Sequence, residues 1–162
     1  MNALSNRQLA ALAGLGSAAL LAAALTFQAV GYAPCELCIL QRWPHLAAAV
    51  LGLVIWFFGW RRVIAILGLL AALTATGFAI YHTGVELKYW PGPQHCSGGI
   101  GGLTQMSTSD LFSTLQSAPI VRCDQVAWSL FGISMAGWNG ICSAILSLIW
   151  ALSLRTGTPA RA

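Results

Sequence analysis

Four long stretches without a single charged residue constrain this chain more than any other feature. They run from about Leu9 to Val30, Trp43 to Trp60, Val63 to Tyr81 and Val126 to Leu154. About 20 apolar residues in a helix cross a bilayer, and a charge near its centre costs about 3 kcal/mol. The sequence therefore predicts an all-α integral membrane protein, a bundle of four transmembrane helices forming a single domain over residues 1–162.

The composition excludes an ordinary soluble domain. Only 7% of the residues are charged, whereas a soluble domain carries about 25%. Recurrent small residues in the stretches, such as Gly14, Gly52, Gly68 and Gly77, predict close approach of the helix backbones. A cleaved signal peptide is the alternative for the first stretch, but that stretch exceeds the usual apolar core of about 7–15 residues.

The basic residues predict which ends of the stretches face the cytoplasm. Those at the termini and in the turn between stretches two and three have no acidic neighbour: Arg7, Arg61, Arg62, Arg155 and Arg161. The opposite loops, about 31–42 and 82–125, contain all the acidic residues. An excess of Lys and Arg marks cytoplasmic segments. We therefore expect both termini in the cytoplasm and both loops outside, and the net charge of +4 reflects topology rather than nucleic-acid binding.

Aromatic residues and the second loop add two weaker expectations. Aromatic side chains near the ends of the stretches, including Trp56, Trp60 and Trp150, are typical of interfacial anchors. Within the second loop, Leu111, Phe112 and Leu115 are consistent with a short helix on the membrane surface, or equally with an irregular loop.

The cysteines are the candidate chemical groups. Cys35 and Cys38 form a Cys-x-x-Cys pair in the first loop, and Cys96 and Cys123 share the second loop. Cys-x-x-Cys spacing is typical of redox-active pairs, and the outer side of a bacterial membrane permits disulfides. Cys142 lies within the fourth stretch, where we expect a small buried apolar residue without a redox role.

The position of the Cys-x-x-Cys pair favours a reactive thiolate. The pair lies where the second helix should begin, and a helix N-terminus stabilises an anion. Arg42 follows Cys38 by four residues, so both would share one helix face. The guanidinium would favour the Cys38 thiolate and could polarise a quinone carbonyl. A snorkelling Arg42 is the simpler alternative, and His82, at the end of the third stretch, is either a second contact to the quinone or an interfacial histidine.

Two other interpretations of the cysteines stay open. The four loop cysteines could form two structural disulfides, although a Cys-x-x-Cys ring is small and readily reduced. They could also bind zinc, either as Cys35, Cys38, Cys96 and Cys123 or in a set with His82 or His95. The spacing in the second loop does not match a zinc knuckle, so our prediction includes no metal.

Three segments resemble the disulfide bond formation protein B family. Residues 34–42, which read PCELCILQR, resemble the first outer loop of that family. Tyr81-His82-Thr83, followed by Tyr89-Trp90-Pro91 and Cys96, is similar to the third span and second loop. Cys123-Asp124, followed by Trp128, Phe131-Gly132 and Trp138-Asn139, is similar to the entry to the fourth span. Cys142 is extra to the four family cysteines.

The resemblance implies a function and a role for each site residue. The chain would reoxidise a soluble periplasmic thiol oxidase of the DsbA type and pass the electrons to ubiquinone or menaquinone at the bacterial inner membrane. Cys35 and Cys38 would be the quinone-linked pair, with the Cys38 thiolate facing the ring. Cys96 and Cys123 would form the second disulfide, with Cys96 attacked by the partner and Cys123 pairing transiently with Cys35. Arg42 and His82 would contact the quinone.

Two alternative functions are compatible with some of the same sequence features. A quinone reductase of the vitamin K epoxide reductase type also uses four helices, a Cys-x-x-Cys and a loop pair, but its Cys-x-x-Cys typically lies late in the chain. A membrane protein with purely structural disulfides is the other alternative, and resistance to the glutathione pool would identify it.

Overall fold

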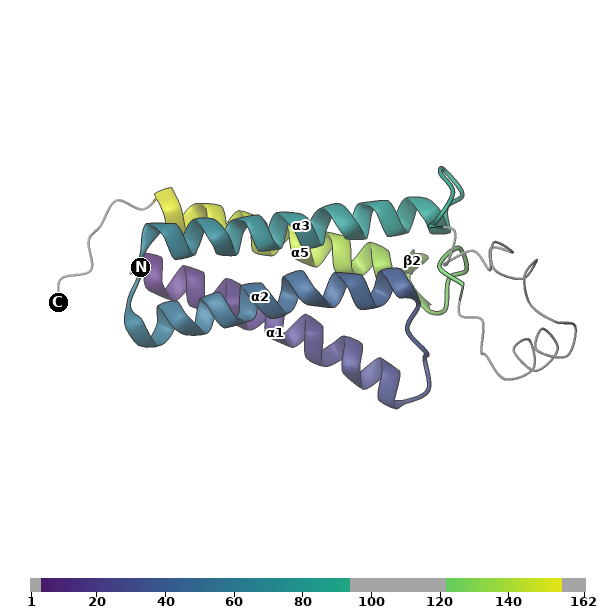
Figure 1. Ribbon diagram of the computed structural model, residues 1–162, viewed down its shortest axis with the longest axis horizontal. Coiled ribbons are helices and arrows are strands. Elements are labelled where there is room, and N and C mark those ends of the chain that lie inside the picture. The colour runs from purple at the N-terminus through teal and green to yellow at the C-terminus, as the bar shows by residue number, and fades with distance from the viewer. Residues whose placement is uncertain (1–3, 94–121, 156–162) are drawn as a thin grey trace, which may run out of the picture.

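Four long helices make up most of the molecule. The computed structural model describes residues 4–93 and 122–155, in which α1 (Asn6–Ala29), α2 (Glu36–Phe58), α3 (Arg62–Glu86) and α5 (Met135–Arg155) lie side by side (Figure 1). Each of these helices is long and apolar enough to cross a membrane. The predicted all-α four-helix membrane bundle is therefore confirmed.

The bundle has a core of small residues and an apolar outer surface. Each helix packs against two neighbours, and α1 and α3 face each other across the diagonal with little contact. The central cluster includes Ala10, Ala13, Ala65 and Ala72, all buried. Many large apolar side chains point outward, among them Leu15, Leu53, Phe57, Phe58 and Leu148. Such a distribution suits lipid, where close backbone packing rather than hydrophobic burial holds helices together.

Two glycines bring α1 and α2 into direct backbone contact. A Cβ atom added to Gly14 would lie 2.6 Å from the Cα of Gly52, and the reverse distance is the same. Gly68 similarly accommodates the Trp150 ring, 2.5 Å from an added Cβ, whereas nothing lies within 4 Å of Gly77. The small-residue prediction is thus correct for Gly14, Gly52 and Gly68. Trp150 is fully buried, so the expectation that it anchors at the membrane interface is wrong.

The helices begin and end at different residues from the apolar stretches. Helix α2 begins at Glu36 rather than near Trp43, and α3 continues past Tyr81 to Glu86. Charged residues ended these stretches in the sequence, but a charge at a helix end does not stop the backbone hydrogen bonding. The limits of the membrane itself stay a prediction, and the piece around Leu111 lies outside the described residues.

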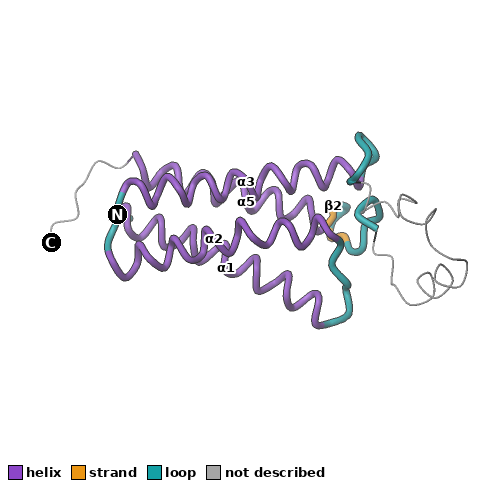
Figure 2. The backbone as a smooth tube through the Cα atoms, viewed as in Figure 1, coloured by secondary structure: helices purple, strands orange, loops and turns teal. Residues whose placement is uncertain are grey.

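A tight hairpin precedes the last helix. Strands β1 (Ser129–Leu130) and β2 (Ile133–Ser134) pair antiparallel (Figure 2), so α5 begins at Met135 rather than near Val126. Phe131 and Gly132 both have positive φ, 53° and 77°, as a two-residue hairpin turn of the primed type requires. Ser134 Oγ accepts the Gly137 N–H at 3.1 Å and donates to the Glu86 carboxylate, which ties α5 to the end of α3.

The described basic residues without acidic neighbours lie at one end of the bundle: Arg7, Arg61, Arg62 and Arg155. The start of α1, the turn between α2 and α3, and the end of α5 lie together, opposite the start of α2 (Figure 1). Arg7 lies 5.3 Å from the centre of the Trp56 ring and donates to the Trp56 carbonyl. This arrangement agrees with the sidedness expected from the sequence.

The contact between Gly14 and Gly52 can be tested by adding a methyl group. Gly52→Ala would force the two backbones apart and should destabilise the bundle by about 1–3 kcal/mol. Gly77→Ala is the matched control; it meets no neighbour and should be neutral or stabilising by up to about 1 kcal/mol through helix propensity. Thermal unfolding in detergent measures both, and equal midpoints for the two variants would contradict this account.

Candidate redox site

The Cys-x-x-Cys pair forms the N-terminus of α2. Cys35 is the N-cap residue, and its sulfur accepts the backbone N–H of Cys38 at 3.2 Å. The sulfur atoms of Cys35 and Cys38 lie 2.6 Å apart. Both thiols are free, Cys35 is buried, and Cys38 is half-buried. The two sulfurs are therefore held face to face at a helix end that favours negative charge.

The two sulfurs differ in their surroundings. The hydrogen bond to Cys38, together with burial, raises the pKa of the Cys35 thiol above its usual value. Either sulfur can be the donor in this contact, and the raised pKa favours Cys35 as the member that keeps its proton. When one thiol of the reduced pair ionises, the negative charge is then favoured on Cys38.

His82 and Cys123 lie against the buried side of the pair. His82 Nε2 is 3.6 Å from the Cys35 sulfur, and His82 also forms a hydrogen bond with the backbone of Cys123. Cys35 and Cys123 share a buried cluster with Leu37 and Val85, and Cys38 packs against this cluster. The second cysteine region therefore contacts the first directly.

A cavity opens beside the Cys38 sulfur between the end of α1, the start of α2 and the start of α5. Its volume is about 330 Å³. Its apolar wall includes Leu20, Phe27, Ala127, Trp128 and Met135, and its polar wall includes Cys38, Gln41, Arg42 and His82. Ligand sites of about 300–1,000 Å³ with a few convergent polar groups are the usual form of a small-molecule pocket.

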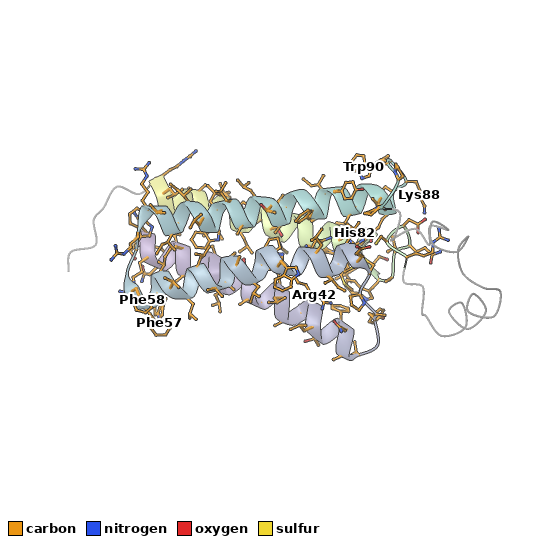
Figure 3. The ribbon with its side chains drawn as sticks, in the orientation of Figure 1. Arg42, Phe57, Phe58, His82, Lys88 and Trp90 are labelled. Atoms are coloured by element: carbon orange, nitrogen blue, oxygen red, sulfur yellow. The ribbon has the colours of Figure 1, made fainter. Side chains whose placement is uncertain are left out.

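Arg42 and His82 reach this cavity from two different helices (Figure 3). The Arg42 guanidinium donates to Gln28 Oε1 of α1 at 2.6 Å. Its Nε is buried and has no hydrogen-bond partner within the part of the chain that the structure describes. A buried donor without a partner is unusual, and the Arg42 side chain also lines the cavity.

Three further polar side chains line the same cavity deeper in the bundle. Gln41 lies 2.8 Å from His82, Asn139 donates to Gln41 at 2.6 Å, and His45 lies 2.9 Å from Asn139. None of these residues had a role predicted from the sequence. For His45 and Asn139 the signal that could have identified them is a polar side chain inside an otherwise apolar stretch, since lipid makes such side chains costly; Gln41 lies outside the stretches and gave no such signal.

An ionic clamp holds the residue next to Cys123. Asp124 accepts hydrogen bonds from Arg122 at 2.9 and 2.8 Å and from Lys88 Nζ at 2.6 Å. Lys88 also donates to the Asp124 carbonyl at 2.8 Å. The bonds from Arg122 and then from Lys88 lower the pKa of Asp124 well below its usual range. The clamp therefore joins the segment around Cys123 to the end of α3.

The same donors can also be considered as metal ligands. The sulfur atoms of Cys35 and Cys38 and a ring nitrogen of His82 lie within 4.8 Å of one another. A structural zinc site needs four ligands, and this group supplies three. The zinc alternative with Cys96 or His95 involves residues outside the described part of the chain.

Comparison with known proteins identifies the family. The family model described as disulfide bond formation protein DsbB matches residues 6–153. A protein named disulfide bond formation protein B from Verminephrobacter eiseniae is 34% identical, over 93% of this chain and 87% of its own. Proteins of the same name from Polaromonas naphthalenivorans and Pasteurella multocida are 31% and 30% identical, over 88% and 85% of this chain and 87% and 80% of their own. No solved structure matches.

The chain belongs to the disulfide bond formation protein B family. It is a multi-pass membrane protein of disulfide bond formation, and the resemblance expected from the three sequence segments is confirmed. Within this DsbB-type bundle, Cys35, Cys38, Arg42 and His82 lie around one cavity, and Cys123 packs against the pair.

In this DsbB family member, Cys123 and Cys142 differ from the Cys-x-x-Cys pair in bonding state or position. Cys123 is disulfide-bonded, whereas Cys35, Cys38 and Cys142 are free; Cys96 lies outside the described residues, so its predicted pairing with Cys123 stays a prediction. Cys142 is half-buried and lines the cavity, which differs from the expectation of a fully buried residue, because α5 turns this position toward the space beside α1.

The clamp on Asp124 should protect the disulfide of Cys123. Asp124→Asn weakens it, and we expect a small phosphine to reduce the Cys123 disulfide about two- to fivefold faster, in line with partly exposed ion pairs. Because the pKa of Asp124 is lowered in the folded protein, the clamp persists above about pH 4 and weakens only as the pH falls further. Mass-tagging of released thiols at neutral pH measures the rate.

Arg155→Gln is the control for loss of a charge at the opposite end of the bundle, and its reduction rate should equal that of the wild type. Equal rates for Asp124→Asn and the wild type would show that the clamp does not protect the disulfide.

Proposed function

We propose that this protein is a thiol:quinone oxidoreductase of the bacterial inner membrane, which regenerates a DsbA-like periplasmic thiol oxidase. Membership of the DsbB family supports disulfide formation in a membrane. The quinone, the soluble partner and the orientation in the membrane are our inferences. The observation that carries them is the cavity that places the Cys38 sulfur and the Arg42 guanidinium on one wall.

The cavity suits an apolar ring with polar oxygen atoms. Its lining is mostly apolar, with aromatic side chains at Phe27, Trp128 and Trp138. The guanidinium of Arg42, a residue that lines the cavity, would supply a cationic donor for one ring oxygen. A quinone, when bound, supplies an acceptor for two electrons and two protons. The sequence and the cavity do not favour ubiquinone over menaquinone, so the proposal covers both.

The electrons would move through two exchanges of sulfur bonds. The two thiols of the partner reduce the Cys96–Cys123 disulfide by exchange, and the partner leaves with its own disulfide closed. The Cys123 thiolate then attacks Cys35 of the oxidised Cys35–Cys38 pair; a Cys123–Cys35 bond forms, the Cys35–Cys38 bond breaks, and Cys38 leaves as a thiolate. Cys96 would next attack Cys123, which re-forms the Cys96–Cys123 disulfide and releases Cys35 as a thiol. When Cys35 and Cys38 become a disulfide again, two electrons and two protons pass to the acceptor.

Several contacts of the described residues support this order. Cys35 and Cys123 share one buried cluster, which supports an exchange between Cys123 and the Cys35–Cys38 pair. Cys38 is the more exposed member of its pair and lines the cavity. The charge of Arg42 on the same wall would stabilise negative charge that develops on an acceptor oxygen. His82 would be a second contact at the buried side of the cavity.

The arrangement of charges supports the proposed orientation. The end of the bundle with Arg7, Arg61, Arg62 and Arg155 would face the cytoplasm. The Cys-x-x-Cys pair, Cys123 and the hairpin lie at the opposite end. That end would face the periplasm, where disulfides persist and a soluble thiol oxidase can reach them.

Replacing Cys38 tests the assignment of the reactive sulfur. Cys38→Ser removes the thiolate beside the cavity and should lower quinone-dependent reoxidation of a DsbA-like partner to background, at least a hundredfold. Oxygen-independent turnover with added ubiquinone-1 and menadione measures this. Cys142→Ser should retain turnover, and a Cys38→Ser variant that still reoxidised the partner would overturn the assignment.

Replacing Arg42 separates quinone binding from disulfide exchange. Arg42→Met keeps much of the side-chain volume but loses the charge, and we expect KM for quinone to rise about ten- to a hundredfold. A single exchange with reduced partner, without quinone, should proceed at the wild-type rate. Arg61→Met, a charge loss at the far end, is the control. An unchanged KM in Arg42→Met would indicate that this arginine only orders the helix ends.

A further inference from the structure

A continuous chain of hydrogen bonds connects the middle of the bundle to the redox pair. It begins at His45 of α2, passes to Asn139 of α5 at 2.9 Å, and returns to Gln41 of α2 at 2.6 Å. From Gln41 it reaches His82 of α3 at 2.8 Å and then the Cys35 sulfur at 3.6 Å. Three side chains of this hydrogen-bond chain are at most 6% exposed: Gln41, His45 and His82.

The two amides give the chain a direction. Asn139 Nδ2 donates to Gln41 Oε1, so the Gln41 nitrogen Nε2 faces His82 Nδ1. An amide nitrogen only donates, and therefore His82 Nδ1 must be the unprotonated nitrogen of a neutral ring. The proton of His82 then lies on Nε2, which faces the Cys35 sulfur.

The reversed direction would leave a buried donor unsatisfied. If both amides turned over, His45 Nε2 would have to accept, and the His45 proton would move to Nδ1. That nitrogen is buried and has no partner among the described residues. A buried N–H without an acceptor is less tolerated than an unused acceptor site. His45 therefore selects the direction in which every donor points toward Cys35.

We infer that Gln41, Asn139 and His45 are positioning residues, which hold His82 in the tautomer that donates its Nε2–H to the Cys35 sulfur. Either sulfur can donate in the contact between Cys35 and Cys38; with the proton on Cys35, the chain ends on the sulfur of Cys38. Aligned hydrogen bonds polarise one another in a medium of low dielectric constant. The chain thus stabilises the thiolate of Cys38 from a distance. This inference rests on the proposed function for its catalytic meaning, whereas the tautomer itself does not.

The tautomer can be measured directly. In reduced protein in detergent, with ¹⁵N-labelled histidine, we expect His82 to show a protonated Nε2 and an unprotonated Nδ1. His→Gln variants at each of the three histidines assign the signals. If His82 in the wild-type protein carried its proton on Nδ1, or had a charged ring, the inference would be overturned.

Asn139→Asp should reverse the chain. An aspartate accepts from both His45 and Gln41, so Gln41 would turn its oxygen to His82 and place the proton on Nδ1. We expect this switch in the spectrum and a fall of about tenfold in quinone-dependent turnover, the size of one lost hydrogen bond to a charged group. Asn139→Leu, which breaks the chain without adding charge, should give a mixture of both tautomers. His82 unchanged in both variants would overturn the inference.

Two further variants separate positioning from simple stability. His45→Gln keeps an N–H near the position of Nε2 and should preserve the tautomer, whereas His45→Leu should not. Ser147→Ala removes a hydroxyl from the same face of α5, bonded to the Ser143 carbonyl at 2.9 Å and outside the chain, and should change neither the tautomer nor the turnover. Absence of quinone-linked turnover in the wild type would count against the proposed function, and the spectrum would still decide the direction of the chain.

Discussion

The start of helix α2 at Cys35 determines the position of every other group in the redox site. Because the Cys35 sulfur accepts the N–H of Cys38, it satisfies one of the free donors at the helix end. Cys38 is then held one turn into the helix, and Arg42 one turn further on the same side. Had the helix begun near Trp43, as the apolar stretch suggested, the pair would lie on an irregular loop and its sulfurs would not face a fixed cavity wall.

Lipid imposes the second constraint, since a polar side chain in the bundle finds no water to satisfy it. Gln41, His45, His82 and Asn139 come from three helices and satisfy one another. These contacts cross between α2, α3 and α5 where the bundle is least tightly filled. The polar groups therefore specify how the helices pack at the end of the bundle that contains the redox site, whereas alanines and glycines specify the packing at the other end.

The sequence was sufficient for the architecture and for most of the redox site. Stretches without charge predicted the four helices, and the position of Arg42 four residues after Cys38 predicted a shared wall. Helix boundaries were less predictable, because Arg42 and His82 end the apolar pattern without ending the helix. The partners of His82 could not be predicted, because contact between Gln41 and Asn139 depends on which faces of α2 and α5 meet. Trp150 was predicted to be an interfacial anchor, because its burial depends on the space left by Gly68 of another helix, and the sequence does not show which residues face each other.

The contact between Gly14 and Gly52 divides the molecule in its tolerance of sequence change. At this crossing α1 and α2 lie too close for a larger residue at Gly14 or Gly52, so a substitution there acts on assembly. On the side toward the redox site α1 leaves the bundle (Figure 1), and side chains on its inner face contact the cavity rather than α2. Leu20, Ala24 and Phe27 can therefore vary with the shape of the molecule that the cavity encloses. Gly14 and Gly52 cannot vary in this way, because the bundle assembles only when both are small.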